Sequence, residues 1–456
     1  MRTVFSEHSN GHIRNLLRKG RTSPSTPEAS LELASKQFSQ ETRALFKEFA
    51  HLDEKCDKIC TVANMIAYPA HSALCEVQSA SDVINKIKLL KTDSELEAIV
   101  LSNLSGRFAH IKNKLNEKTM KTFDYTFRLG MQGVSAADVE MAAQKYKEKD
   151  LQKAAETLLE TTDGHLIEKP QSREQMQTVE EYYRRLLKVS FNLAPAKLKR
   201  RFSNFKDYLK TVEFTETENT SSCHITGKLY LSLRNPDIVY VWKGARSVGT
   251  IDVLGMADTV GEEGLLGHQG QHAFTENSNI PPFLKKSQVP ALINAETIAQ
   301  LGKYRLVEQL KKDPRIFPEI DREDFALLLR NSGIREESEK LGTFLTAYGD
   351  YTYFTKGRSI DAQTTALYEI TKDPYLLTEI SRNMRETHLK NFFGEHEKRA
   401  SYWVYIVSDA LARKIENKLG ALSTASKERV LDQLQLGYWT RDSFEAYFDY
   451  LCKEKA

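Results

Sequence analysis

The sequence predicts a mainly α-helical protein with one small β element between two helical regions. Glycine (22) and proline (12) are scarce among the 456 residues, which disfavours a protein with many turns. Long stretches place apolar residues at the three- and four-residue spacing of helices. We therefore predict a flexible tail (1–27), a helical domain (28–211), a β element (212–260) and a second helical domain (261–456).

The first two parts are separated by a helix-start signal. The tail ends in "RTSPSTP", a Ser/Pro/Thr cluster typical of loops. Thr26, Pro27 and Glu28 then supply a cap, a first-position proline and an early acid. The following segment, "SLELASKQFSQETRALFKEFAHL", carries Leu and Phe at helical spacing, and similar patterns continue to Leu209.

The β element is indicated by a change of composition near Val212, where Thr, Val, Ile and Tyr become frequent. "KLYLSL" and "IVYVW" flank "RNPD", which is a strand–turn–strand pattern. We predict a third strand at "TIDVL" (250–254). Helical patterns return afterwards, as in "ETIAQLGKYRLVEQLKKD" and "SYWVYIVSDALARKIENKLG".

Charge and cysteine content limit the function classes. Lys and Arg (65) nearly balance Asp and Glu (62), so no net field favours nucleic acid as a partner. The sequence has no run of about 18 apolar residues and no apolar signal-peptide core at its start. Five cysteines without framework spacing indicate a reducing, cytosolic location. Cys56 and Cys60 fit apolar helix positions better than metal ligation, and we expect no metal and no cofactor.

The first candidate site lies in "GEEGLLGHQGQHAFTENSNIPPF" (261–283). If this segment is helical, His268, His272 and Glu276 share one face. Such a row can bind a divalent metal or orient an imidazole with a carboxylate, although it lacks the H-E-x-x-H spacing of zinc proteases. The alternative is a glycine-rich linker with exposed histidines, and the local sequence favours neither.

Two downstream segments add further polar groups. "DFALLLRNSGIREESEK" places Asn331, Arg335 and Glu336 directly after an apolar helix, where such groups often line a cleft. "NMRETHLKNFF" places His388 one turn after Arg385. Two histidines and a glutamate on different elements suit phosphoryl or glycosyl-phosphate chemistry. One imidazole attacks or takes a proton, the carboxylate orients it, and the other imidazole protonates the leaving oxygen.

In kind and order, "HQGQHAFTENSNIPPF", "RNSGIREE" and "ETHLKNFF" resemble motifs of a known family. It is the phosphodiesterase domain of the SidE-family effectors of Legionella and the related phosphoribosyl-ubiquitin hydrolases. The resemblance covers about residues 260–400. It implies a helical domain in which His272 is the first catalytic imidazole, Glu336 the carboxylate and His388 the second imidazole.

The resemblance also implies a substrate and a partner. Arg335 becomes a phosphate contact, and we place His268, Asn331 and Arg385 with it among the substrate-binding residues. The reaction is hydrolysis or transfer at a phosphodiester or pyrophosphate joined to ribose, through a histidine-bound phosphoryl intermediate and without an obligatory metal. The expected partner is a host protein carrying ADP-ribose or phosphoribose, met by a bacterial effector translocated into the host cytosol.

The chain departs from the family pattern at three places. Arg330 stands where the family has a histidine, Ile334 is an extra residue within the motif, and Pro281-Pro282 replaces a helical stretch. These departures bear on whether the site is active.

Two other functions remain open from the sequence. An adenylyl or nucleotidyl transferase would use Ser247 and the His272/Glu276 turn, with Lys243 and Arg246 on nucleotide phosphates and the hairpin as a stiff platform. A non-catalytic effector would instead use its first 210 residues to bind a host protein. The sequence does not indicate the oligomeric state.

Overall fold

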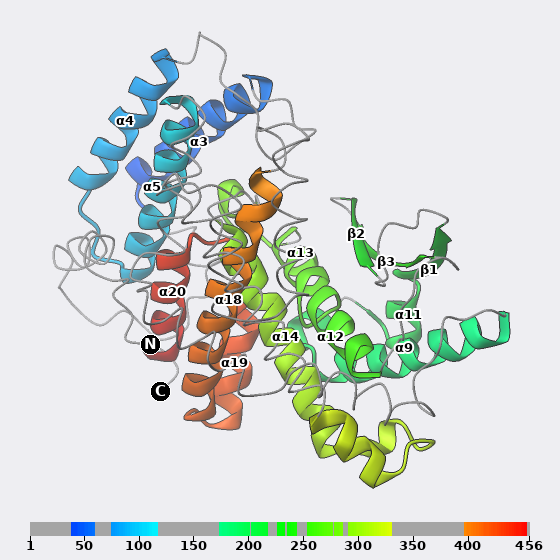
Figure 1. The fold of residues 1–456 in the computed structure, drawn as a ribbon. Helices are drawn as coiled ribbons and strands as arrows, with labels where there is room; N and C mark the ends of the chain where they lie inside the picture. The colour runs from blue at the N-terminus through cyan, green and yellow to red at the C-terminus, as the bar shows by residue number, and fades with distance from the viewer. Residues whose placement is uncertain are drawn as a thin grey trace, which may run out of the picture.

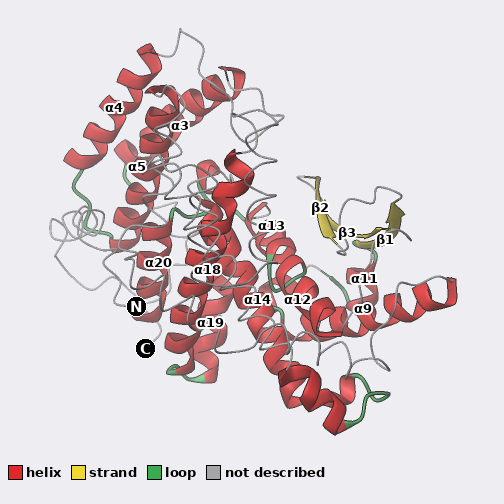
Figure 2. Cartoon of the chain, in the orientation of Figure 1, coloured by secondary structure: helices red, strands yellow, loops and turns green. Residues whose placement is uncertain are grey.

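The mainly α-helical class predicted from the sequence is confirmed (Figures 1 and 2). The structure is a computed structural model, and the residues it describes are 38–59, 74–116, 173–200, 202–217, 226–232, 235–243, 253–276, 278–285, 291–330 and 396–453. The elements are α3 (Gln40–Ile59), α4 (Leu74–Leu89), α5 (Glu95–Asn116), α9 (Arg173–Leu193), α10 (Ala196–Lys199), α11 (Phe205–Leu209), β1 (Val212–Thr217), β2 (Thr226–Ser232), β3 (Asn235–Lys243), α12 (Val253–Glu263), α13 (His268–Glu276), η2 (Pro282–Lys285), α14 (Leu292–Lys312), η4 (Pro314–Ile316), α18 (His396–Gly420), α19 (Thr424–Leu434) and α20 (Arg441–Lys453).

Helix α14 is the central element of the described fold. It packs against α12 on one side and α18 on the other, and it also contacts α9, α13 and α20 (Figure 1). Its sequence explains this position, because a run of buried residues from Ile293 to Gly302 covers more than one face of the helix. The residues that could bear chemistry on α14 are therefore surrounded by neighbouring helices.

Helices α3, α4 and α5 form a group at one end of the molecule (Figure 1). The starts of α3 and α5 are capped by serines: Ser39 Oγ accepts from the Thr42 amide, and Ser94 Oγ accepts from the Glu97 amide. The Glu97 carboxylate in turn accepts from the Ser39 amide at 3.0 Å, which joins the two helix starts. Phe49 of α3 packs edge-on against Phe283, so this group is tied to the rest of the core.

Three strands form a sheet in the order β1-β3-β2, beside α11 and α13 (Figure 2). Strands β2 and β3 pair antiparallel, with Ser232 opposite Asn235. The turn expected at "RNPD" is therefore misplaced, because Asn235, Pro236 and Asp237 are part of β3. Strand β1 pairs parallel with β3, with Val212 opposite Ile238. The expected strand at 250–254 is wrong where the structure describes it, because Val253 and Leu254 begin helix α12.

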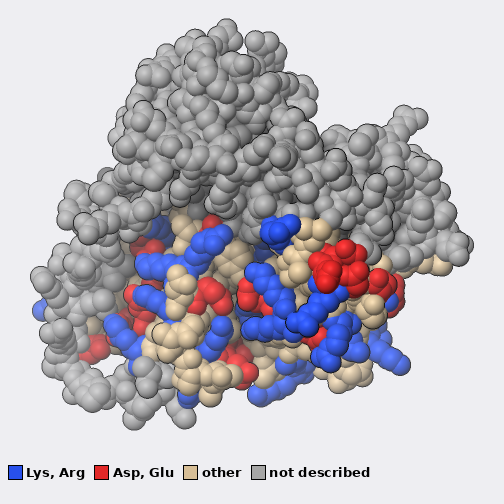
Figure 3. Space-filling model, turned by 60° about the horizontal axis from the view of Figure 1, so that its bottom comes forward, with Lys and Arg blue, Asp and Glu red and all other residues tan. Residues whose placement is uncertain are grey.

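The boundary predicted at residue 260/261 falls inside α12. One hydrophobic cluster contains residues from both predicted helical domains, for example Leu101 and Leu187 with Leu301 and Leu411. No helix among the described residues is long and apolar enough to cross a membrane. On the face drawn in Figure 3, Lys and Arg side chains lie among Asp and Glu side chains.

Candidate functional site

The glycine-rich segment 261–283 contains the end of helix α12, a short turn and helix α13. Helix α12 ends at Glu263, four residues form the turn, and α13 begins at His268. Leu265 and Leu266 of the turn are buried in the core, and their carbonyl oxygens accept hydrogen bonds from Gln435 Nε2. The alternative of an exposed linker is therefore wrong.

Glycines allow α12 and α14 to approach each other closely near this turn. A methyl group added at Gly302 of α14 would lie 2.3 Å from the Gly261 oxygen, and one at Gly267 would lie 1.8 Å from the Glu262 oxygen. No side chain fits at either position without backbone movement. Gly302 thus permits α14 to lie against the end of α12, and Gly267 permits the turn that leads from α12 into α13.

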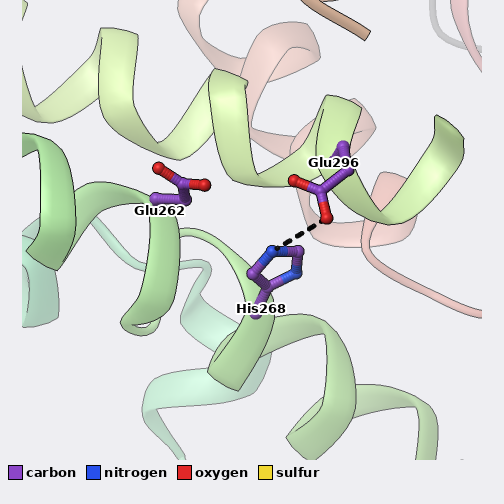
Figure 4. A group of neighbouring side chains, drawn as sticks. All are labelled: Glu262, His268 and Glu296. Carbon is purple, nitrogen blue, oxygen red and sulfur yellow. Dashed lines mark ion pairs between the residues drawn. The ribbon is translucent and has the colours of Figure 1, made fainter. Parts of the chain in front are cut away.

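Three side chains from three helices converge at this junction (Figure 4). Glu262 comes from α12, His268 is the first residue of α13, and Glu296 lies near the start of α14. One ligand atom from each lies within 4.8 Å of the others. His268 Nε2 and Glu296 Oε1 are 3.6 Å apart, and each of these two side chains is only 15% exposed.

Burial and charge perturb the titration of this group. Burial, followed by the charge of Glu296, raises the pKa of Glu262. Burial also raises the pKa of Glu263 to about 7, against the opposing effect of His268. Burial works against a charged His268, but the carboxylate of Glu296, 3.6 Å away, and the charges of Glu263 and Glu262 raise its pKa to about 9. The ion pair of Lys303 with Asp258, at 3.0 Å, lies in the same charged group.

His272, one helical turn after His268, has different surroundings. Its Nδ1 is hydrogen-bonded to the hydroxyl of Tyr438. Burial, and then the positive charge on His268, lowers the pKa of His272 to about 4. The two neighbouring imidazoles are therefore pushed in opposite directions, and His272 is neutral at physiological pH.

Tyr438 is positioned by a short segment between α19 and α20, residues 436–440, whose backbone is bonded to side chains of the core. Its carbonyl oxygen accepts from Arg107 Nη2 of α5 at 2.7 Å. The next amide, on Trp439, donates to Asn294 Oδ1 of α14 at 3.1 Å. Gly437, at a φ of 87°, lets the chain turn here, and its amide donates to Thr275 Oγ1 at 2.9 Å.

Buried polar side chains also fix α13. Gln269 Oε1 accepts from the Tyr208 hydroxyl at 3.0 Å. Gln271 Nε2 donates to Asn294 Oδ1 at 3.0 Å and to the Gly437 oxygen at 3.1 Å. Both histidines thus project from a helix that is held on its other sides, as a preorganised site requires.

The structure describes only part of the set of residues predicted from the sequence. His268 and His272 lie on α13 as expected, and Glu276 is its last residue. Lys243 is the last residue of β3, and Pro282 begins η2. The other predicted site residues lie outside the described residues: Ser247, Arg246, Asn331, Arg335, Glu336, Arg385 and His388.

Sequence reasoning missed three residues that complete the site: Glu262, Glu296 and Tyr438. Glu262 lies six residues before His268, in the same glycine-rich segment. Glu296 was detectable as a lone acid in the apolar stretch "LINAETIAQL". Tyr438 gave no signal, since nothing local relates "LGYWT" to a histidine in another helix.

Comparisons with known proteins assign no family to this chain. No family model and no curated protein matches the sequence. Among solved structures, the chain is similar to one described as a "putative lipoprotein from Colwellia psychrerythraea", with 12% identity and a TM-score of 0.45. The match covers 98% of this chain and 76% of the other. Similarity at this level carries nothing about activity.

Proposed function

We propose that this chain is a phosphodiesterase-type hydrolase in which His272 attacks phosphorus. The observation that carries the proposal is the state of this imidazole, which is partly buried, neutral and hydrogen-bonded through Nδ1 to Tyr438. A neutral, oriented imidazole is the form of histidine that acts as a nucleophile or general base.

The hydrogen bond with Tyr438 sets which ring nitrogen reacts. When Nδ1–H donates to the phenolic oxygen, Nε2 keeps its lone pair. Nε2 then forms a bond to phosphorus while the bond from phosphorus to the leaving oxygen breaks. That oxygen takes a proton from an acid, which the family resemblance places at His388. Water next breaks the nitrogen–phosphorus bond, giving phosphate monoester and free imidazole.

The substrate part of the proposal rests on the resemblance within residues 260–400. It gives a phosphodiester or pyrophosphate joined to ribose, on a protein that carries ADP-ribose or phosphoribose. The place of action is then the cytosol of a host cell that receives the protein as an effector. Glu336 serves as the carboxylate in this scheme, with Asn331, Arg335 and Arg385 at the substrate.

The proposal is tested by replacing His272 with glutamine. Purified wild type and variant are incubated with ADP-ribosylated protein, and released nucleotide is measured by liquid chromatography. We expect His272→Gln to lower the rate on the order of 10²–10⁴-fold. The matched control is His51→Gln on α3, where the histidine is exposed, and it keeps the wild-type rate. Equal thermal melting of the two variants shows that the loss is not unfolding.

Other outcomes distinguish the alternatives. A His272→Gln variant as active as wild type overturns the proposal. Consumption of ATP, abolished by Ser247→Ala, identifies a nucleotidyl transferase instead. If His272, Glu336 and His388 can all be replaced without effect on any turnover, the chain is a binding protein.

A further inference from the structure

We propose that Glu262, His268 and Glu296 bind one divalent transition-metal ion where α12, α13 and α14 meet. The sequence led us to expect no metal, but these three ligands come from three helices and converge on one point (Figure 4). The inference goes beyond the proposed hydrolysis and does not depend on it.

The spacing of the ligand atoms suits one ion. A metal about 2.1 Å from each ligand keeps any two ligands within about 4.2 Å of each other. The three atoms here lie within 4.8 Å, and the His268 Nε2–Glu296 Oε1 pair is already at 3.6 Å. Side-chain movements of a few tenths of an ångström would bring all three ligand atoms to bonding distance of one ion.

The donor types select the class of metal. Two carboxylates and one imidazole suit manganese, iron or zinc, whereas magnesium and calcium favour all-oxygen sites. Three protein ligands also leave coordination positions for water or a phosphate oxygen. The junction lies one helical turn from His272, so the metal would be near the group proposed to attack phosphorus.

A second observation concerns the other oxygen of the Glu296 carboxylate. Glu296 Oε2 is buried, and among the described residues it has no hydrogen-bond partner. Its other oxygen is 3.6 Å from His268, longer than the about 2.8 Å of a charged hydrogen bond. Leaving a carboxylate oxygen buried without a partner is unfavourable, and a metal ion at the centre of the group would satisfy it.

The charges of the neighbourhood agree. Among the described residues, the carboxylates of Asp258, Glu262, Glu263 and Glu296 interact there, and Lys303 supplies a permanent positive charge beside them. With His268 as a neutral ligand, the carboxylates of Glu262 and Glu296 would match the two positive charges of a divalent ion. A buried ion of this kind would be the largest local charge in the site.

The experiment uses Mn²⁺ as the probe on the metal-stripped full-length protein without substrate. Calorimetry measures affinity and stoichiometry, and electron spin-echo spectroscopy detects nitrogen coordinated to manganese. We expect one Mn²⁺ per chain with one histidine nitrogen bound. Glu262→Gln, Glu296→Gln and His268→Asn should each weaken binding by about tenfold or more.

Matched controls are Glu308→Gln, an exposed glutamate on the same helix α14, and His51→Asn. Both should bind Mn²⁺ as wild type does. Absence of Mn²⁺ binding, or binding unchanged in the three ligand variants, overturns the proposal. If those variants do not fold, the wild-type spectrum decides, and a bound Mn²⁺ without nitrogen coupling overturns it. Since no substrate is used, failure here leaves the hydrolase proposal to its own test.

Discussion

Replacing Gly302 with alanine tests whether close helix contact builds the site. The added methyl group would lie 2.3 Å from the Gly261 oxygen and 2.8 Å from the Leu266 carbonyl carbon and oxygen. These are backbone atoms, so no rotamer change relieves the clash, and α12 must move away from α14. Overpacking of this kind costs up to about 3 kcal/mol. The higher helix propensity of alanine returns about 1 kcal/mol, which leaves a net loss of about 2 kcal/mol.

The assay is urea unfolding followed by circular dichroism, with Mn²⁺ binding measured on the folded variant. Gly420→Ala is the matched control, because nothing lies within 4 Å of a methyl group at that end of α18. It should be neutral or stabilising by about 0.5 kcal/mol. Because α12 carries Glu262 and α14 carries Glu296, Gly302→Ala should also weaken Mn²⁺ binding. If Gly302→Ala is as stable as Gly420→Ala, the close crossing of α12 and α14 is refuted.

Three further predictions concern the surroundings of His272. Its folded pKa of about 4 lies below the ordinary 6.5, so the unfolded chain binds more protons between these values. Stability should therefore fall by about 3 kcal/mol as the pH drops from 6.5 to 4. When the urea midpoint is plotted against pH, His272→Gln should show a shallower slope than wild type. An equal slope would contradict the pKa assigned to His272. Tyr438→Phe removes the hydroxyl that is hydrogen-bonded to His272 Nδ1 and should destabilise the protein by about 1–2 kcal/mol. ¹⁵N NMR should show a changed balance between the two tautomers of the His272 ring. An unchanged balance would show that Tyr438 does not set the tautomer. Asn294→Ala leaves the Gln271 and Trp439 donors without their shared acceptor, and it should lower the free energy of unfolding in urea by about 3 kcal/mol. Asn192 is exposed, so Asn192→Ala should change that free energy little. Equal urea midpoints for the two variants would argue against the buried network.

The helical class was predictable because it depends on repeated local patterns. Apolar spacing indicated the long helices, and the two β-rich runs on either side of "RNPD" indicated the strand pair that β2 and β3 form. The turn itself was misplaced, because Asn235, Pro236 and Asp237 belong to β3. The third strand was misplaced because strand pairing is not local. Strand β1 joins β3 in parallel from a distant position, while Val253 begins a helix.

The site was predictable only in part, and the reason is also physical. The spacing of His268 and His272 gave both residues, since a four-residue step places them on one helix face. The glycines around them suggested a breakable segment because their propensity disfavours helices. In the fold their lack of a side chain permits the close contact of α12 with α14. Glu296 and Tyr438 reach the histidines only through tertiary packing, which no local pattern encodes.

The most direct test of the central claim is to identify the residue that carries the phosphoryl group during turnover. Wild-type protein is denatured in alkali while it acts on ADP-ribosylated protein, and the phosphorylated peptide is mapped by mass spectrometry. We predict an acid-labile phosphoryl group on His272, absent from His272→Gln and present in His51→Gln. Turnover with the label on another residue, or with no label on any histidine, would contradict it.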